Sequence, residues 1–333
     1  MSTLYIDRQG SQLKLSGGVL VVNTPDEASA RRLPLKYLER VVLRTDTELS
    51  SKVLCGLAAE GVNLIALGGR RGEEIAQITG SPHNDAKRRW QQVLFLSQEA
   101  GCTQFARRIV IAKVKKQLAV LRHLSALRPD LRKPMHDGQR QIATIVEALL
   151  TDEKNNNLKL EQIRGMEGAG AAAYFGAYFT AFAPKLGATG RNRRPPRDPV
   201  NAVLSLSYTM LYSRATEACW AAGLDPAIGA LHSMSHGRAA LACDLMEPLR
   251  PAVDSWVWQL FRDGHLRAEH FGLDGAGHCL LGKAGRSSYY PLWEEQQKRL
   301  GKILQKYAKL ASSAFVTADT PSHWSALTDH EGG

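Results

Sequence analysis

The residues IAQITGSPHNDA, at positions 75–86, mark the point where the pattern of this chain changes from strands to helices. Before this stretch, short segments rich in Val, Ile and Leu are bounded by turn residues, which is typical of β-strands. These segments are residues 4–7, 12–15, 19–22, 40–43, 63–66 and 75–78. One short helix is expected near residues 50–60. Gly80-Ser81-Pro82 breaks the strand pattern and is a candidate linker.

After the stretch, apolar residues recur at steps of three and four, as on one face of an amphipathic helix. The clearest series is Ile111, Val114, Leu118, Leu121 and Leu124. Further helices are expected at residues 84–99, 137–150, 158–182, 199–222, 239–262 and 288–310. Strands followed by a run of helices predict an α+β fold rather than a βαβ fold. We therefore expect a β-rich domain at 1–80, an all-α domain at 81–311 and a polar, flexible tail at 312–333.

Composition narrows the classes of protein to consider. The 333 residues include 44% apolar residues, enough for a sizeable core, and carry a net charge of +11, which favours an acidic polymer as partner. No apolar run is long enough to span a membrane, and no secretory signal is visible at the start. The five cysteines form no C-x-x-C pair, so a reducing, cytoplasmic location is expected. The G-x-G-x-x-G and P-loop patterns are absent, so nothing in the sequence supports nucleotide-driven chemistry.

The excess positive charge is concentrated in one segment. Residues 81–133 hold 12 Lys and Arg against 3 acidic residues, which is +9 of the total of +11. Such a concentration is the electrostatic footprint of a phosphate-binding surface, although a solvated helix face is the alternative. The cations are Lys87, Arg88, Arg89, Arg107, Arg108, Lys113, Lys115, Lys116, Arg122, Arg128, Arg132 and Lys133.

Glu167 precedes a segment without charge, GAGAAAYFGAYFTAFAP at 168–184. A carboxylate at the edge of such a segment, on a buried helix, is costly unless it is paired or binds a cation. The small residues that follow it on the same helix face leave room for a close neighbour. A structural ion pair with Arg164, one turn earlier, explains the same pattern, so both interpretations stay open here.

A second acidic cluster lies in GALHSMSHGRAALACDLMEPLR at 229–250. Asp244 and Glu247 are three residues apart and share one face of a helix, where a cation or an arginine would relieve their repulsion. His232 precedes them in a predicted loop. Histidine with carboxylates suits Mn²⁺ or Mg²⁺ better than a structural zinc site. His236 is a competing candidate ligand, and spacing alone does not choose between the two.

A basic, proline-containing loop precedes the helix expected at 199–222. Asp198 is its predicted N-cap and Pro199 its first residue. The arginines of this loop, Arg193, Arg194 and Arg197, are candidate phosphate contacts. Outside the loop, Arg238, Arg250, Lys283, Arg286 and Tyr289 are weaker candidates.

Four ordered motifs in the chain resemble one family. They are M-E-G-x-x-A-x-x-Y-F at 166–175, R-R-P-P-x-D-P-V-N-A-x-L-S at 193–205, G-L-D-P-x-x-G-x-L-H at 223–232 and G-R-x-x-L-x-x-D-L-M-E-P-L-R at 237–250. The chain resembles the CRISPR-associated integrase of spacer acquisition, the first Cas family (Cas-one). The motifs cover residues 166–250 densely, and the strand-then-helix layout extends the resemblance over most of the chain.

The resemblance implies a β-sandwich-like N-terminal domain and a helical catalytic domain. Carried over by motif, the metal ligands are Glu167, His232 and Glu247, with Asp244 assisting the site and His236 outside the pattern. Mg²⁺ or Mn²⁺ is the implied cofactor. The implied partners are double-stranded DNA with 3′-hydroxyl ends, CRISPR repeat DNA, a second copy of the chain and a small ferredoxin-like protein of the second Cas family.

The expected activity is insertion of short DNA fragments into a CRISPR array by 3′-hydroxyl attack on a phosphodiester. A mobile-element integrase or a branched-DNA nuclease could use the same fold and site. A non-catalytic scaffold that binds DNA ends is the alternative from another class of protein. In that case the acidic cluster would be structural.

Overall fold

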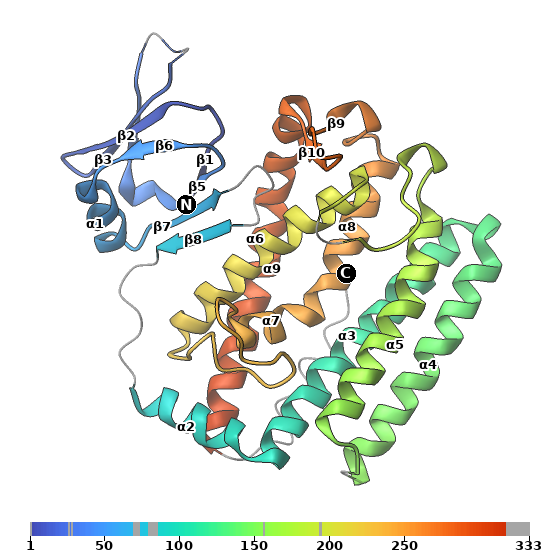
Figure 1. Cartoon of the computed structure of the whole chain (residues 1–333). Helices are drawn as coiled ribbons and strands as arrows, with labels where there is room; N and C mark the ends of the chain where they lie inside the picture. The colour runs from blue at the N-terminus through green and yellow to red at the C-terminus, as the bar shows by residue number, and fades with distance from the viewer. Residues whose placement is uncertain are drawn as a thin grey trace. The chain divides into compact units, whose positions relative to one another are not determined.

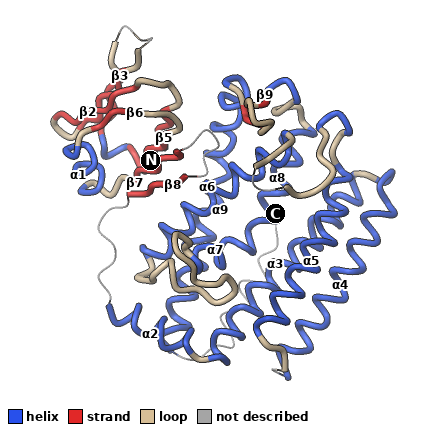
Figure 2. The backbone as a smooth tube through the Cα atoms, viewed as in Figure 1, coloured by secondary structure: helices blue, strands red, loops and turns tan. Residues whose placement is uncertain are grey.

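The computed structural model describes residues 2–25, 27, 29–68, 74–78, 86–155, 157–192 and 195–317. The chain divides into two compact units, residues 1–83 and 84–333. The candidate linker at 80–82 lies outside the described residues. Figure 2 shows that strands dominate the first unit and helices the second.

The N-terminal unit contains two four-stranded sheets and one short helix (Figure 1). The first sheet has the order β1-β5-β7-β8, in which only β8 is antiparallel to its neighbour. Its strands are β1 (Ser2–Ile6), β5 (Leu38–Leu43), β7 (Asn63–Gly68) and β8 (Glu74–Ile78). The second sheet has the order β4-β3-β2-β6. Its strands are β4 (Arg31–Pro34), β3 (Val19–Asn23), β2 (Ser11–Ser16) and β6 (Thr47–Leu49).

The core of this unit draws apolar residues from both sheets and from α1 (Ser51–Ala59). In β3, buried and half-buried residues alternate, so one face of the strand points into the core. The six predicted strands and the helix are confirmed, and so is the α+β class. The strands β4 and β6 were not predicted. The sequence of β4, with Arg31-Arg32 and Pro34, lacks the apolar pattern of a strand. It can still form one because β4 lies at the edge of its sheet, where charged residues and proline are tolerated.

The second unit is built around α3 (Glu99–Leu127), which packs against α4 (Arg132–Asn155), α5 (Leu160–Tyr178) and α8 (Arg250–Arg262) (Figure 1). The five apolar residues of the predicted helical series, Ile111 to Leu124, are all buried. Two more helices, α2 (Ala86–Ser97) and α9 (Lys283–Thr317), pack against each other. The predicted helices other than 239–262 are therefore confirmed, with ends shifted by a few residues.

The predicted start of α6 (Pro199–Ala221) is confirmed. Asp198 lies at the N-cap, and its carboxylate accepts the backbone N–H of Asn201 at 2.8 Å. By contrast, the prediction of one helix over 239–262 is wrong. Here α7 (Ala240–Met246) ends in a single 3₁₀ turn, η5 (Glu247–Leu249), before α8 begins. Pro248 has no N–H to continue the α-helical hydrogen bonds, so the chain changes direction at Glu247.

The second unit is not purely helical. A hairpin of β9 (Phe271–Leu273) and β10 (Cys279–Leu281) precedes α9, so the all-α expectation is corrected to largely helical. Helix α9 continues to Thr317, beyond the expected start of the tail at 312, because Ser312 and Phe315 are buried in the unit. Residues 318–333 lie outside the described residues.

In the part of the chain that the structure describes, none of the helices combines the length and the apolar character that crossing a bilayer requires.

Candidate active site

Lys113 of α3 connects two of the predicted metal ligands. Its ammonium donates to Glu167 Oε1 on α5 and lies 2.6 Å from Glu247 Oε2 in η5. The side chains of Lys113 and Glu247 are 7% and 4% exposed, whereas that of Glu167 is 27% exposed. The cluster is therefore closed on the η5 side, and solvent reaches it past Glu167.

His232 completes the cluster. Its Nε2 atom lies 3.7 Å from Glu247 Oε1, and its Nδ1 atom lies 2.7 Å from Asp244 Oδ1. The Asp244 carboxylate accepts a hydrogen bond from Nδ1–H in the tautomer that places the Nε2 lone pair on the side of Glu247. The structure therefore brings Glu167, His232 and Glu247 to one place, and Asp244 orients the imidazole.

Asp244 also fixes the loop that carries His232. It is fully buried and accepts the backbone N–H groups of Ala230, Leu231 and His232 at 2.7, 3.1 and 3.0 Å. Gly229 makes this approach possible. A Cβ atom there would lie 2.8 Å from Asp244 Oδ2 and 2.6 Å from the backbone of α7. The glycine of the G-x-L-H motif is thus required by close packing.

Spacing left open an ion pair between Arg164 and Glu167, and His236 in place of His232. The positions of Arg164 and His236 in the structure bear on both. Arg164 does not pair with Glu167, because its guanidinium donates to the backbone carbonyls of Leu231 and Ala230 at 2.7 and 3.1 Å. It thereby supports the His232 loop from α5. His236 is exposed, four residues further along the loop.

Charge at the cluster keeps Glu247 ionised. Burial alone raises the pKa of Glu247, but the positive charges of Arg250 and Lys113 outweigh burial and lower this pKa to about 2. Arg250 Nε lies 2.8 Å from Glu247 Oε1, and its guanidinium stacks 4.5 Å from the centre of the Tyr208 ring. Arg250, predicted as a DNA contact, is thus part of the cluster.

The chemistry of these side chains fits a divalent cation. Two carboxylates and one imidazole nitrogen are suitable ligands for Mg²⁺ or Mn²⁺. In the described residues, however, no three His, Cys, Asp or Glu side chains are grouped closely enough to hold a metal ion. Instead of a metal ion, the Lys113 ammonium lies between the Glu167 and Glu247 carboxylates and pairs with both.

The basic segment differs from the expected exposed patch. Arg107, Arg108 and Lys113 are buried, and the two arginines pair with Asp152 at 2.9 Å and Glu153 at 3.2 Å. Lys116 Nζ donates to Tyr307 Oη at 2.7 Å, and burial lowers the pKa of Lys116 to about 8. The prediction of one solvent-facing cationic surface is therefore wrong for these residues, because α3 is a central helix. Lys115 is half-buried.

The other DNA-contact candidates occupy different environments. Arg197, Arg238 and Lys283 are exposed, whereas Arg286 donates to the Leu281 carbonyl at 3.0 Å. Tyr289 is fully buried, with its hydroxyl 3.0 Å from Ser207 Oγ, so the prediction that it contacts DNA is wrong. Arg193 and Arg194 lie outside the described residues.

Sequence reasoning missed Lys113 and Arg250 as members of the cluster. It also missed Asp254, which is buried beside Arg250 and Tyr208. Arg250 carried a usable signal, since it follows Glu247 by three residues. Lys113 carried none, because nothing in the helical period distinguishes it from the other cations of its segment.

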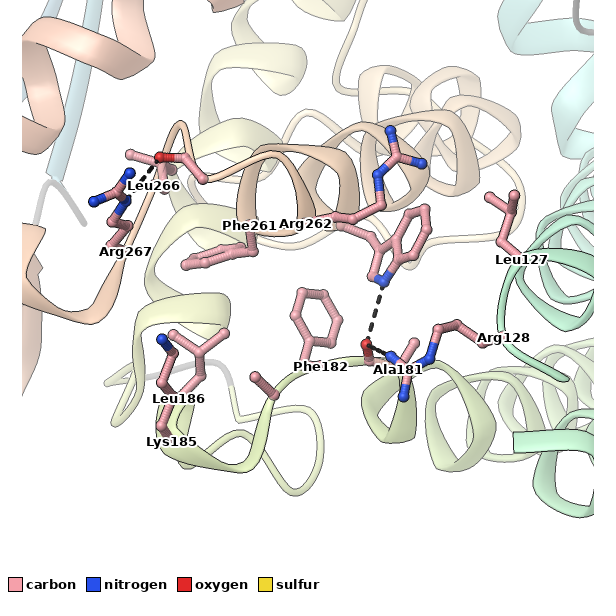
Figure 3. Close-up of a pocket in the computed structure, with 13 residues that line it drawn as sticks. Leu127, Arg128, Ala181, Phe182, Lys185, Leu186, Phe261, Arg262, Leu266 and Arg267 are labelled. Carbon is pink, nitrogen blue, oxygen red and sulfur yellow. Dashed lines mark hydrogen bonds between the residues drawn. The ribbon is translucent and has the colours of Figure 1, made fainter. Parts of the chain in front are cut away.

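A pocket of about 500 Å³ lies at the C-terminal ends of α3 and α8, and none of the cluster residues lines it. Its lining includes Phe182 and Phe261, whose rings make an edge-to-face contact with centroids 5.9 Å apart, and also Lys185, Arg262 and Arg267 (Figure 3). Its lining contains no carboxylate, histidine or cysteine. This pocket therefore lacks groups for metal or acid–base chemistry, and the cluster around Lys113 is the candidate active site.

Comparison with known proteins gives the family. The family model "CRISPR associated protein Cas1" matches residues 4–295. Named relatives include "CRISPR-associated endonuclease Cas1 1" of Thermodesulfovibrio yellowstonii, 32% identical over 90% of this chain and 93% of the relative. "CRISPR-associated endonuclease Cas1 2" of Rhodospirillum rubrum is 33% identical over 96% of this chain and 93% of the relative.

Two solved structures share the fold. "Casposase bound to integration product" has a TM-score of 0.84 at 19% identity and covers 100% of this chain and 95% of that one. "Cas6-RT-Cas1--Cas2 complex" has a TM-score of 0.82 at 22% identity and covers 99% of this chain and 36% of that one. With a family model over most of its length and relatives above 30% identity, the chain belongs to the Cas1 family of CRISPR-associated endonucleases.

Proposed function

We propose that this protein is a divalent-metal-dependent DNA endonuclease and integrase that inserts short DNA fragments into a CRISPR array. The observation that supports the proposal is that Lys113 joins Glu167 to Glu247, while His232 Nε2 lies 3.7 Å from the other oxygen of Glu247. These three residues would hold Mg²⁺ or Mn²⁺. When bound, the metal would stabilise negative charge that develops on the phosphate oxygens.

The side chains around the ligands prepare the site. Asp244 holds the His232 ring so that Nε2 faces the carboxylates, and Arg250 keeps Glu247 ionised within a buried environment. A rigid, correctly oriented ligand set binds a metal and positions a substrate better than a mobile one does. We therefore assign Asp244 and Arg250 as positioning residues for the three ligands.

The proposed reaction is a transesterification. The 3′-hydroxyl of a short DNA attacks a phosphodiester at the edge of a repeat, a new P–O bond forms, and the 3′-oxygen of the repeat strand leaves with a proton. One phosphodiester replaces another, so no nucleotide hydrolysis is needed. Exposed cations such as Arg197, Arg238 and Lys283 would contact the DNA backbone and position it without reading its sequence.

The proposal includes two protein partners. We expect a homodimer and a complex with a small ferredoxin-like protein of the second Cas family. The name of one structural neighbour, a Cas1–Cas2 complex, supports the second partner.

The test is integration of a short DNA with 3′-hydroxyl ends into a repeat-bearing plasmid, with the small partner present. Glu167→Gln should reduce joining by more than about a hundredfold, because it removes a metal ligand. Glu161→Gln, on the exposed first turn of the same helix, is the matched control and should retain joining. Full joining by folded Glu167→Gln, or joining in excess chelator, would favour the alternative of a non-catalytic DNA-end scaffold.

A second candidate function is favoured by one comparison. The structural neighbour named as a casposase bound to its integration product has a TM-score of 0.84, so a mobile-element integrase remains a competitor for the same site. The plasmid substrate separates the two. Joining that requires the repeat supports spacer insertion, and equal joining without the repeat supports the mobile-element function or a branched-DNA nuclease.

A further inference from the structure

Lys113 is a buried cation at the centre of the proposed metal site. Its side chain is 7% exposed, and its ammonium contacts one carboxylate from α5 and one from η5. A buried charge is stable only when it is paired, and Lys113 pairs with both carboxylates. With Arg250, which pairs with Glu247, two positive charges balance the two carboxylates without a metal ion.

Lys113 differs from the other cation of the cluster. Arg250 contacts Glu247 at 2.8 Å, and its guanidinium is stacked on Tyr208, so it is fixed on one side of a single carboxylate. Lys113 alone among the described cations bridges Glu167 and Glu247. A lysine ammonium is a compact point charge on a flexible stem, so it can occupy the position of a small cation and also move away from it.

We propose that the Lys113 ammonium holds the two carboxylates together in the metal-free protein and must be displaced before a divalent cation can bind. This inference rests on the proposed metal-dependent function. The ammonium and the metal compete for the same oxygen atoms, Glu167 Oε1 and Glu247 Oε2. Lys113 thereby sets the metal affinity of the site, which is a role distinct from contact with DNA.

The competition predicts opposite effects of one substitution. Lys113→Met keeps the length of the side chain and removes its charge. It should raise the affinity for Mn²⁺ by on the order of tenfold or more, because two carboxylates then face the metal without a bound ammonium. It should also lower the melting temperature of the metal-free protein and enlarge the increase in melting temperature that Mn²⁺ produces.

The experiment measures Mn²⁺ binding to the full-length protein by electron paramagnetic resonance of the free ion. Lys116→Met is the matched control, because it removes a half-buried lysine of the same helix that donates to Tyr307 and does not contact the carboxylates, and it should bind Mn²⁺ as the wild type does. Equal or weaker Mn²⁺ binding by Lys113→Met overturns the inference. Failure of the wild type to bind Mn²⁺ at all, or unaltered binding by Glu167→Gln, contradicts the proposed function itself.

A second measurement needs no variant at position 113. Amine labelling of the wild-type protein, followed by mass spectrometry, measures how fast each lysine side chain reacts with the reagent. A lysine held in an ion pair reacts slowly. Labelling of Lys113 should be slow without metal and should rise severalfold with Mn²⁺, while labelling of Lys116 stays constant. Labelling of Lys113 that is unchanged by saturating Mn²⁺ overturns the inference.

Discussion

Glu247 and Asp254 are two buried carboxylates that precede and follow Arg250 in the sequence, and their pKa values are shifted in opposite directions. Both are almost fully buried, at 3% and 1% exposure. Glu247 is surrounded by cations, which lower its pKa to about 2 in spite of burial. Asp254 accepts a hydrogen bond from the Tyr208 hydroxyl, and burial raises its pKa to about 6 although that hydrogen bond opposes the rise.

The difference shows what separates a proposed metal-ligand carboxylate from a structural one. Burial is common to both, so burial does not identify the site. Glu247 is kept ionised and shares a bridging cation with Glu167, a carboxylate from another helix. Asp254 accepts a hydrogen bond from the Tyr208 hydroxyl, a contact that joins α6 to α8. Only the first arrangement offers negative charge to a metal ion.

The largest effect that tests this comparison is on DNA joining. Glu247→Gln should reduce joining by more than about a hundredfold, because the amide supplies no negative charge to the metal. Asp254→Asn should join DNA at a rate within about tenfold of the wild type, because Asp254 is linked to the proposed metal ligands only through its neighbour Arg250. Rates are compared at saturating DNA for variants that circular dichroism shows to be folded. A similar loss in both variants would remove the distinction between the two carboxylates.

The second effect is on the stability of the protein and concerns Asp254. Tyr208→Phe leaves the buried Asp254 carboxyl without its hydroxyl partner and should lower the free energy of unfolding by about 1–3 kcal/mol. Mn²⁺ affinity should remain as in the wild type. Urea denaturation and Mn²⁺ titration measure the two quantities separately. Unchanged stability with lost Mn²⁺ binding would place Tyr208 in the metal site instead.

The third effect is the pH dependence of stability, which should have opposite signs for the two groups. The pKa of Asp254 rises on folding from 3.8 to about 6, so stability falls as pH increases through that window. In metal-free protein the pKa of Glu247 drops on folding from 4.5 to about 2, so stability falls as pH decreases through that window. Asp254→Asn should flatten the first slope alone, and Glu247→Gln the second. Melting curves in chelator from pH 3 to 7 test both signs.

The smallest effect concerns an exposed cation outside the cluster. Arg238→Gln should reduce the slope of log affinity against log salt concentration by about 0.9, the value for one lost phosphate contact. Joining at saturating DNA should be unchanged, because Arg238 supplies affinity and not chemistry. An unaltered slope would show that Arg238 makes no phosphate contact.

Much of the fold could be predicted because its signals are local. The amphipathic series from Ile111 to Leu124 and the cap at Asp198 both depend on residues within a few turns of one another. The signal for the helix break at Glu247 was also local, because Pro248 is the next residue. The prediction of one helix over 239–262 did not take this proline into account. The hairpin of β9 and β10 was missed because each strand has only three residues.

The site was less predictable because its partners are distant in the sequence. Spacing proposed Asp244 and Glu247 but left His232 and His236 equal, and the family motifs favoured His232. Lys113 looked like one phosphate contact among many, since its pairing with Glu167 joins residues 54 positions apart. The charge of a segment does not say whether its cations face solvent or carboxylates brought from elsewhere by the fold.

Anomalous diffraction from crystals of the wild-type protein soaked in Mn²⁺ tests directly whether Glu167, His232 and Glu247 bind a metal ion. We expect one strong peak within about 2.5 Å of His232 Nε2 and of a carboxylate oxygen from both Glu167 and Glu247. The Lys113 ammonium should have left its position between the two carboxylates. A fully soaked crystal with no peak there would contradict the proposed metal site. A peak with Lys113 still bridging Glu167 and Glu247 would contradict its displacement by the metal.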